Sequence, residues 1–433
     1  MILQRNGFRL LNGMEFGTVL NDMEKANAVT HQFRLLLLLF NAPRVSAVRM
    51  RCVGYSCTIT DVRTVEELFV MHYIPAKIRF TTMENVQIKH LHTSCIDQVQ
   101  SKFRSIHIHK SNTLSVLTVS AAASWLSLTF RYTGLKDIIF EKHCKLETLT
   151  VAYSRLVTIP ATIYRGTALT SIEMTHSAIQ TVEMALFCNL SRLKKLNLSA
   201  NKVRTVVNSG SRTCTVYDSL EEWNMSQNLL KTISMTLFRP YRMLRVLHLK
   251  KNLIRLFAGS FASDMLQSLD ISDNKLKVFS LCQWRIPFLT ALSLNDNQLS
   301  KLPFCLDNLK TLAKLEMDDN QLEDIDFIDM AWMDNLENLN LSGNKLRSLT
   351  LNSSDFPMKL KKLCIDGNNI TKLQLLVVPG VALAVNAQNN QITDFDKNAT
   401  SPKISELEMK GNPMDCSWKN LESRMNSECY RDT

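Results

Sequence analysis

The stretch that decides the fold is LKKLNLSANKV, residues 193–203. Apolar residues occupy its first, fourth, sixth and eleventh positions, and an asparagine occupies the ninth. The same spacing returns in LRVLHLKKNLI, residues 244–254, and in LQSLDISDNKL, residues 266–276. A chain that repeats one short pattern at a nearly constant interval is built from stacked copies of one structural unit.

The ninth-position asparagine recurs every 22 to 24 residues through the second half of the chain, with one longer interval of 27 residues. These residues, which we call the ladder asparagines, are Asn201, Asn228, Asn252, Asn274, Asn297, Asn320, Asn344, Asn368, Asn390 and Asn412. The phase continues towards the N-terminus with a hydroxyl residue in the same place, at Ser111, Thr133, Ser154 and Ser177. A degenerate first coil is aligned on Pro75, Ile78, Phe80 and Met83.

The L-x-L centre of the pattern predicts a short strand whose alternate side chains point inward. The asparagine then satisfies buried backbone groups inside the coil. A hydroxyl reaches less far than an amide, so the first coils should be less regular. Because one coil cannot bury its own apolar face, the copies must stack. This pattern is that of leucine-rich repeats, and it predicts an α/β repeat solenoid, a horseshoe with a parallel sheet on its concave face.

Cysteines flank the repeats at both ends. Cys52 and Cys57 precede the first coil, and Cys416 and Cys429 follow the last ladder asparagine. Extracellular repeat proteins close their ends with such disulfide-bearing segments, and the C-terminal one here is abbreviated. We therefore expect an N-terminal cap at 48–74, repeats of about 14–15 coils at 75–412, and a short C-terminal cap at 413–433.

Residues 1–47 form an N-terminal extension with features of a signal peptide. The apolar run LLLLLF, residues 35–40, follows Arg34 and precedes Ser46-Ala47. This resembles a leader of ordinary length if translation begins at Met23 and cleavage falls near Ala47. The alternative is an ordinary buried strand or helix. No other stretch is apolar enough to cross a membrane.

Composition favours an extracellular binding protein. Eleven cysteines in 433 residues, none of them in a C-x-x-C pair, favour an oxidising compartment. The formal charge of +11 is partly concentrated near the N-terminus, which argues against nucleic-acid binding. Phosphate-loop, H-E-x-x-H and G-x-S-x-G motifs are absent from the sequence. We therefore expect neither an enzyme nor a cofactor.

The outward residues of the strands predict a polar concave surface for a protein partner. Its N-terminal end is basic and its middle is acidic, so that it would steer a partner of complementary charge. The residues that we expect to contact the partner are Arg104, His107, His109, Arg131, His248, Asp270, Asp296, Glu316 and Asp318. The alternative is that any one of them is merely solvated.

Two further cysteines share one phase of the repeat. Cys282 and Cys305 each lie eight residues after a ladder asparagine, within disulfide reach in stacked coils, although buried free thiols are the competing interpretation. Cys364 occupies an outward strand position, where a disulfide-linked dimer is one outcome and an incidental thiol the other. His90, His92, Cys95, His107 and His109 gather near the N-terminus, but without a repeated ligand spacing we predict no metal site.

Seven N-x-S/T sequons are candidate glycosylation sites if the chain is secreted. They begin at Asn189, Asn197, Asn224, Asn340, Asn352, Asn369 and Asn398. Glycans on Asn197, Asn224 and Asn340 would cover part of the concave surface.

The cysteine-bearing entry, Cys52 to Ile59, and the exit N-x-x-x-C, Asn412 to Cys416, resemble those of the leucine-rich immune family of mosquitoes. That resemblance implies a secreted haemolymph protein that acts with complement-like thioester proteins in recognising microbial surfaces. Its long members continue into a coiled coil, so this chain would be a short member. An extracellular adhesion or developmental protein and a cytosolic scaffold that regulates an enzyme remain alternatives.

Overall fold

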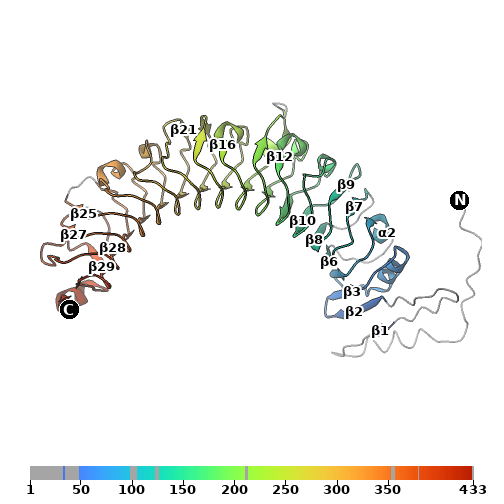
Figure 1. Cartoon of the computed structure of the whole chain (residues 1–433), viewed down its shortest axis with the longest axis horizontal. Coiled ribbons are helices and arrows are strands. Elements are labelled where there is room, and N and C mark those ends of the chain that lie inside the picture. The colour runs from blue at the N-terminus through green and yellow to red at the C-terminus, as the bar shows by residue number, and fades with distance from the viewer. Residues whose placement is uncertain are drawn as a thin grey trace, which may run out of the picture.

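The computed structural model describes residues 33–34, 48–97, 105–121, 126–209, 213–352, 356–378 and 380–431. The chain winds into one curved solenoid (Figure 1). An 18-stranded sheet lines its inner curve, and short strands and single turns of 3-10 helix cover its outer curve. The predicted leucine-rich-repeat solenoid with a concave parallel sheet is thereby confirmed.

The inner sheet takes one strand from each coil. One strand, β2 (Arg49–Val53), runs antiparallel to both of its neighbours, β1 (Phe33–Arg34) and β3 (Ser56–Thr60), and the other strand pairings in the sheet are parallel. The parallel strands are β3 (Ser56–Thr60), β4 (Phe80–Glu84), β6 (Ser105–Ser111), β8 (Ser127–Thr133), β10 (Thr148–Ala152), β11 (Ser171–Thr175), β13 (Lys195–Asn197), β15 (Glu222–Asn224), β17 (Val246–His248), β20 (Ser268–Asp270), β22 (Ala291–Ser293), β23 (Lys314–Glu316), β24 (Asn338–Asn340), β26 (Lys362–Cys364), β28 (Leu383–Asn386) and β29 (Ile404–Glu408).

The core is a continuous stack of the inward side chains. Leu196, Trp223 and Leu247 pair in register on three successive strands, and all three are buried. Each buried leucine contributes about 1.5–3 kcal/mol to folding. Since those contacts lie mainly between neighbouring coils, the stability of the solenoid depends on stacking.

The ladder asparagines bond the coils to one another. Asn320, for example, accepts a hydrogen bond from the backbone N–H of Leu299 at 3.0 Å and donates to the carbonyl oxygen of Leu294 at 3.0 Å. In the earlier coils, two of the hydroxyl residues at this position form a hydrogen bond with each other. The hydroxyl oxygens of Ser154 and Ser177 lie 2.8 Å apart. Ser111, by contrast, still accepts a hydrogen bond from the backbone N–H of Val86 in the preceding coil, at 2.9 Å.

The alignment of the first coil on Phe80 is wrong. The Phe80 side chain is 52% exposed, whereas Thr81 and Met83 are fully buried. Thr81 lies in register with Cys57 and Ile106, both of which point inward. The inward position assigned to Phe80 is held by Met83, three residues later, in register with Ile108. Because strand side chains alternate, a shift by an odd number of residues turns the aromatic ring outward.

The outer face carries a discontinuous set of short elements. Its strands pair within small groups: β5 (His90–His92), β7 (Val116–Val119) and β9 (Asp137–Phe140); β12 (Thr181–Glu183) and β14 (Thr205–Val207); β16 (Thr232–Ser234) and β18 (Leu256–Ala258); β19 (Phe261–Ala262) and β21 (Trp284–Arg285); β25 (Ser348–Leu351) and β27 (Lys372–Leu375). Its helical turns are η1 (Glu66–Tyr73), α2 (Ser94–Asp97), η2 (Ile163–Arg165), η3 (Met184–Phe187), η4 (Thr215–Asp218), η5 (Met235–Leu237), η6 (Leu306–Asn308) and η7 (Phe327–Met330).

A disulfide closes each end, as predicted for disulfide-bearing caps. Cys52 and Cys57 are paired across the β2–β3 hairpin. At the other end, a disulfide joins Cys416 to Cys429, close to β30 (Met414–Asp415), α3 (Leu421–Asn426) and β31 (Tyr430–Arg431). Trp418 is buried beneath the guanidinium of Arg424, which lies 5.2 Å from the ring centroid. The backbone of Trp418 also forms an antiparallel bridge with Leu407, so the cap is joined directly to the last strand of the solenoid.

The apolar run at residues 35–40, Met23 and Ala47 lie outside the described residues. Within the described ranges, no helix combines the length and apolar character that a membrane crossing requires.

Candidate binding surface on the concave face

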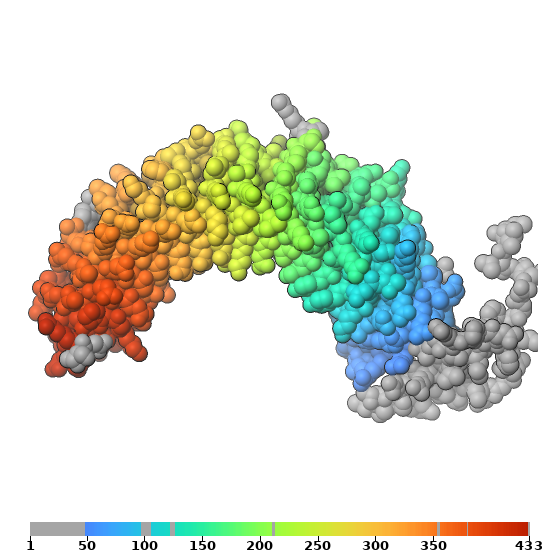
Figure 2. Space-filling model, in the orientation of Figure 1, coloured from blue at the N-terminus to red at the C-terminus, as the bar shows by residue number. Residues whose placement is uncertain are grey.

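The register of the sheet aligns the outward central residue of every strand in one column along the concave face. His107 pairs with Thr129, and the column continues coil by coil to Glu408. Figure 2 shows the inner curve as an open hollow between the two ends of the molecule. A partner can therefore contact many coils at once.

The basic end of the surface lies on β6 and β8. His107 and His109 are half-buried, and Arg131 is exposed on the neighbouring strand. Burial, together with the positive charge of Arg131, lowers the pKa of both imidazoles. The Nε2 atom of His109 is buried without a hydrogen-bond partner. The lowered pKa favours the neutral form of both histidines, whereas the guanidinium of Arg131 is positively charged. Arg104 lies outside the described residues.

The acidic end begins at β20 with Asp270. Burial opposes ionisation of this carboxyl, but the nearby imidazole of His248 and hydrogen bonds from Ser272 outweigh burial and lower its pKa. The hydroxyl of Ser272 donates to Oδ1 of Asp270 at 2.6 Å, and Nδ1 of His248 lies 3.8 Å from Oδ2. Glu316 behaves alike, because bonds from Lys314 and Ser293 outweigh its burial. Both carboxylates are charged but already have partners within the protein.

Asp318 differs from these two carboxylates. Burial and the negative charges of Asp319 and Glu316 raise its pKa. Its Oδ1 atom accepts one hydrogen bond, from Nδ2 of Asn340 at 2.8 Å. A cationic group of a partner would relieve the repulsion that raises this pKa. Asp296 lies apart from the strand, in the left-handed turn that follows it, with φ of 54°.

Sequence reasoning missed a row of stacked rings beside the basic end. The ring centroids of Tyr132 and Tyr153 lie 4.5 Å apart, and those of Tyr153 and His176 lie 4.3 Å apart. Each residue has a positive φ and immediately precedes a ladder hydroxyl residue, so the repeat phase was a usable signal. The rings add an exposed aromatic edge to the candidate surface.

Two disulfides staple neighbouring coils away from the concave face. Cys282 is bonded to Cys305, with 5.1 Å between their Cα atoms. A second bond, Cys188 to Cys214, was missed, although the two residues lie 13 and 14 positions before successive ladder asparagines. Cys364 takes part in no disulfide; it lies half-buried on β26, and burial raises the pKa of its thiol. A raised pKa reduces the thiolate needed for an intermolecular bond.

The sequon asparagines fall into two groups. Asn189, Asn352, Asn369 and Asn398 are exposed, whereas Asn197, Asn224 and Asn340 are half-buried on the concave strands. The side-chain oxygens of the concave asparagines accept hydrogen bonds from the backbone N–H of Ser199, Ser226 and Ser342. These bonds hold the concave asparagines against the sheet, so the exposed group is the more accessible to a glycosyltransferase.

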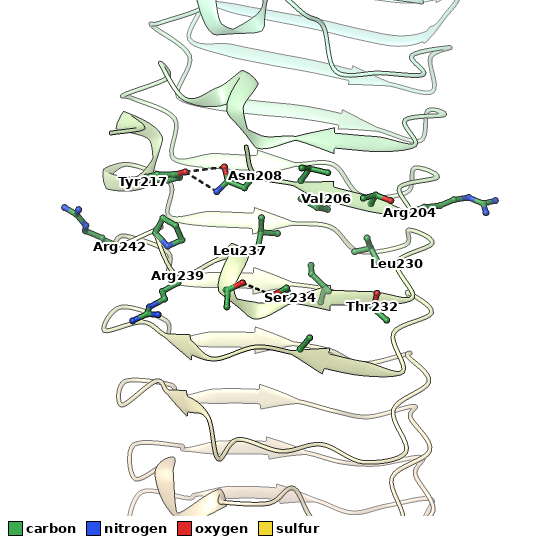
Figure 3. A pocket seen from close by; sticks show the side chains of 16 residues that line it. Arg204, Val206, Asn208, Tyr217, Leu230, Thr232, Ser234, Leu237, Arg239 and Arg242 are labelled. Atoms are coloured by element: carbon green, nitrogen blue, oxygen red, sulfur yellow. Dashed lines mark hydrogen bonds between the residues drawn. The ribbon is translucent and has the colours of Figure 1, made fainter. Parts of the chain in front are cut away.

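The outer face contains a hollow of about 960 Å³ between β14 and β16, where the pairing of outer strands is interrupted (Figure 3). Nδ2 of Asn208 donates to the hydroxyl of Tyr217 at 3.1 Å on one side of it. The side chains of Arg204 and Arg242 point away from it in Figure 3. The described residues that line it include no carboxylate, imidazole or thiol, so it offers no acid–base pair for catalysis.

The N-terminal histidines have individual partners. Nε2 of His90 lies 2.9 Å from the hydroxyl of Thr118, and Nε2 of His92 lies 3.3 Å from a carboxylate oxygen of Glu141. Within the part of the chain that the structure describes, no three histidine, cysteine, aspartate or glutamate side chains form a group suited to a metal ion.

Comparisons with known proteins support the repeat. The leucine-rich-repeat family model matches residues 144–203. A solved leucine-rich-repeat protein of Leptospira interrogans shares 18% sequence identity, with a TM-score of 0.55 over 81% of this chain and 94% of that one. The leucine-rich-repeat domain of APL1B shares 22% identity, with a TM-score of 0.45 over 67% of this chain and 77% of that one. No curated protein matches the chain. No enzymatic family is indicated, and leucine-rich-repeat proteins generally bind other proteins.

Proposed function

We propose that this chain is a secreted protein of innate immunity that binds another protein through its concave face. Its partner would be a complement-like thioester protein, or a microbial surface to which such a protein is recruited. The observation that carries the proposal is the separation of charge along the concave strands: the positive charge of Arg131 lies on β8, and the carboxylates of Asp270 and Glu316 lie in register on β20 and β23. A partner with the opposite polarity can bind in only one orientation.

The disulfides support an extracellular location. Four are present, at both ends and between internal coils. Disulfides persist in oxidising compartments and are rare in the cytosol. This favours a secreted binding protein over a cytosolic scaffold.

The location is tested by expressing the chain in insect cells. We expect the medium to contain the protein, with an intact mass that reflects loss of a leader near Ala47. Its mobility on a gel should shift on glycosidase treatment and on reduction. Protein that stays in the cell, without glycans and with reduced cysteines, would contradict the secreted function. A reducible dimer would in addition implicate Cys364 or Cys95, the half-buried thiols outside the disulfides.

The binding face is tested with a purified mosquito thioester-containing protein as the probe, in a surface-binding assay. Asp318→Asn with Asp319→Asn removes two acidic charges with little change of shape, and Arg131→Gln removes the basic one. We expect at least one of these variants to weaken binding about tenfold, which corresponds to 1.4 kcal/mol.

The matched control is Glu422→Gln with Glu428→Gln, two exposed carboxylates near the C-terminus. Its binding should equal that of the unchanged protein. The proposal would be refuted if the unchanged protein did not bind the thioester protein. It would also be refuted if the concave-face variants and the control variant lost the same amount of binding affinity. Expression that is constant in tissues and independent of infection would favour an adhesion protein instead.

A further inference from the structure

The outer face of two adjacent coils exposes three large apolar side chains. Trp332 is 68% exposed, Phe304 is 54% exposed and Ile328 is 51% exposed. Trp223, Trp284 and Trp418, the other tryptophans that the structure describes, are each no more than 5% exposed. Trp332 is therefore the exception among the described tryptophans. Tryptophan is enriched among the residues that contribute most of the binding energy at protein interfaces, so an exposed one indicates a binding site.

The local fold forces these side chains outward. Phe327, Met330 and Met333 are buried in the core at η7 and just after it. Ile328 and Trp332 lie between those inward positions and therefore face the solvent. Oδ1 of Asp326 accepts a hydrogen bond from the backbone N–H of Ile328 at 3.0 Å, which fixes the start of the turn. The exposed side chains are thus presented by a well-anchored backbone.

The three apolar residues line one hollow of about 770 Å³, on which the Cys282–Cys305 disulfide borders. Five carboxylates line the same hollow, and Lys301 is the single basic residue among its described lining. The carboxylates are Asp307, Glu323, Asp324, Asp326 and Asp329. We call these residues, with Trp332, Phe304 and Ile328, the outer acidic surface.

Most of this negative charge is not neutralised within the protein. Glu323 lies 3.7 Å from a guanidinium nitrogen of Arg347, and Asp326 is engaged with the backbone. Asp307, Asp324 and Asp329 are exposed, and no salt bridge joins them to a described residue. The whole chain carries a formal charge of +11, so this acidity is a local feature.

From this combination we infer that the outer acidic surface binds a cationic amphipathic peptide segment of a partner protein. Apolar side chains of the segment would pack on Trp332, Phe304 and Ile328, and its lysines or arginines would pair with Asp307, Asp324 and Asp329. An arginine above Trp332 would gain a cation–π contact as well. A neutral segment would leave the carboxylates unpaired, and an acidic one would be repelled. The site lies on the opposite side of the coils from the concave surface, so the two bind independently.

The inference is tested on the full chain with a synthetic peptide of 18 residues, leucines on one helical face and lysines on the other. Its dissociation constant is measured by fluorescence anisotropy in low and high salt. A second readout is acrylamide quenching of tryptophan fluorescence, compared with that of Trp332→Phe. A peptide with glutamate in place of lysine is the charge control.

We expect the lysine peptide to bind, to shield Trp332 from acrylamide and to weaken in high salt. Trp332→Ala and, separately, Asp324→Asn with Asp329→Asn should each weaken it about tenfold or more. Phe288→Ala, another exposed aromatic residue, and Glu422→Gln with Glu428→Gln should bind normally.

Equal binding by Trp332→Ala, or equal binding of the glutamate peptide, would overturn the inference. A third result would also overturn it: the unchanged protein binds no peptide but associates with itself, and Trp332→Ala abolishes that self-association. The surface would then be occupied by a second copy of the chain. None of these variants alters the concave surface, so failure here leaves the proposed function untouched.

Discussion

Replacing the ladder residue Asn320 by alanine should cost about 2–4 kcal/mol of unfolding free energy. The side chain is 6% exposed and makes four hydrogen bonds. All three of its carbonyl acceptors keep another partner after the change: Leu294 is also bonded by Asn297, Met317 by Asn344, and Asp318 by the backbone N–H of Asp296. The backbone N–H of Leu299 has no other partner among the described residues and would be left unsatisfied. One orphaned buried donor costs about 1–3 kcal/mol, and the lost shared bonds add the remainder.

The control is Asn112→Ala, because Asn112 is exposed and outside the ladder. It should change stability by less than about 0.5 kcal/mol. Asn320→Asp is a sharper variant, since a carboxylate still accepts from Leu299 but faces the carbonyl oxygens. Burial and those oxygens would raise its pKa in the folded state above the unfolded value. Its destabilisation should therefore be present at neutral pH and diminish as the pH falls through the folded pKa.

The measurement is urea unfolding of the disulfide-intact protein, followed by circular dichroism and by tryptophan fluorescence. Coincidence of the two curves shows whether the coils unfold together, which repeat proteins do not always do. Our account of the repeat is refuted if the unfolding free energy of Asn320→Ala lies within about 0.5 kcal/mol of that of Asn112→Ala. The amides of the ladder asparagines would then not be what satisfies the buried backbone groups inside the coil.

Two further predictions concern the disulfides and the histidines. Cys282→Ala with Cys305→Ala should lower the unfolding free energy by about 3 kcal/mol, the loop-closure entropy of residues separated by 23 positions, and an unchanged urea midpoint would contradict this. The lowered pKa of His107 and His109 contributes stability above the unfolded pKa of about 6.5 that is lost as the pH falls through the folded value. The urea midpoint of His107→Asn with His109→Asn should therefore fall less between pH 7.5 and 5.5 than that of the unchanged protein; equal falls would show that folding does not lower the pKa of these two imidazoles.

Much of the fold and part of the candidate surface could be read from the repeat period. Every coil has nearly the same length, so residues one period apart are neighbours in space. This is why the outward column from His107 to Glu408 could be assigned before the structure, and why Cys282 and Cys305 could be placed side by side. Phe80 was misplaced because the first coil lacks the asparagine and leucines that mark the phase.

The sequence by itself determined the period, the inward side chains and the polar character of the concave face, because each follows from the alternation of a strand and the stacking of equal coils. Only the tertiary structure decided which outward residues meet. The stack of Tyr132, Tyr153 and His176 and the hollow beneath Trp332 arise where backbone turns and 3-10 segments of adjacent coils come together. Those contacts are set by how neighbouring coils pack against one another. The repeat pattern does not specify which residue types occupy the positions that make them.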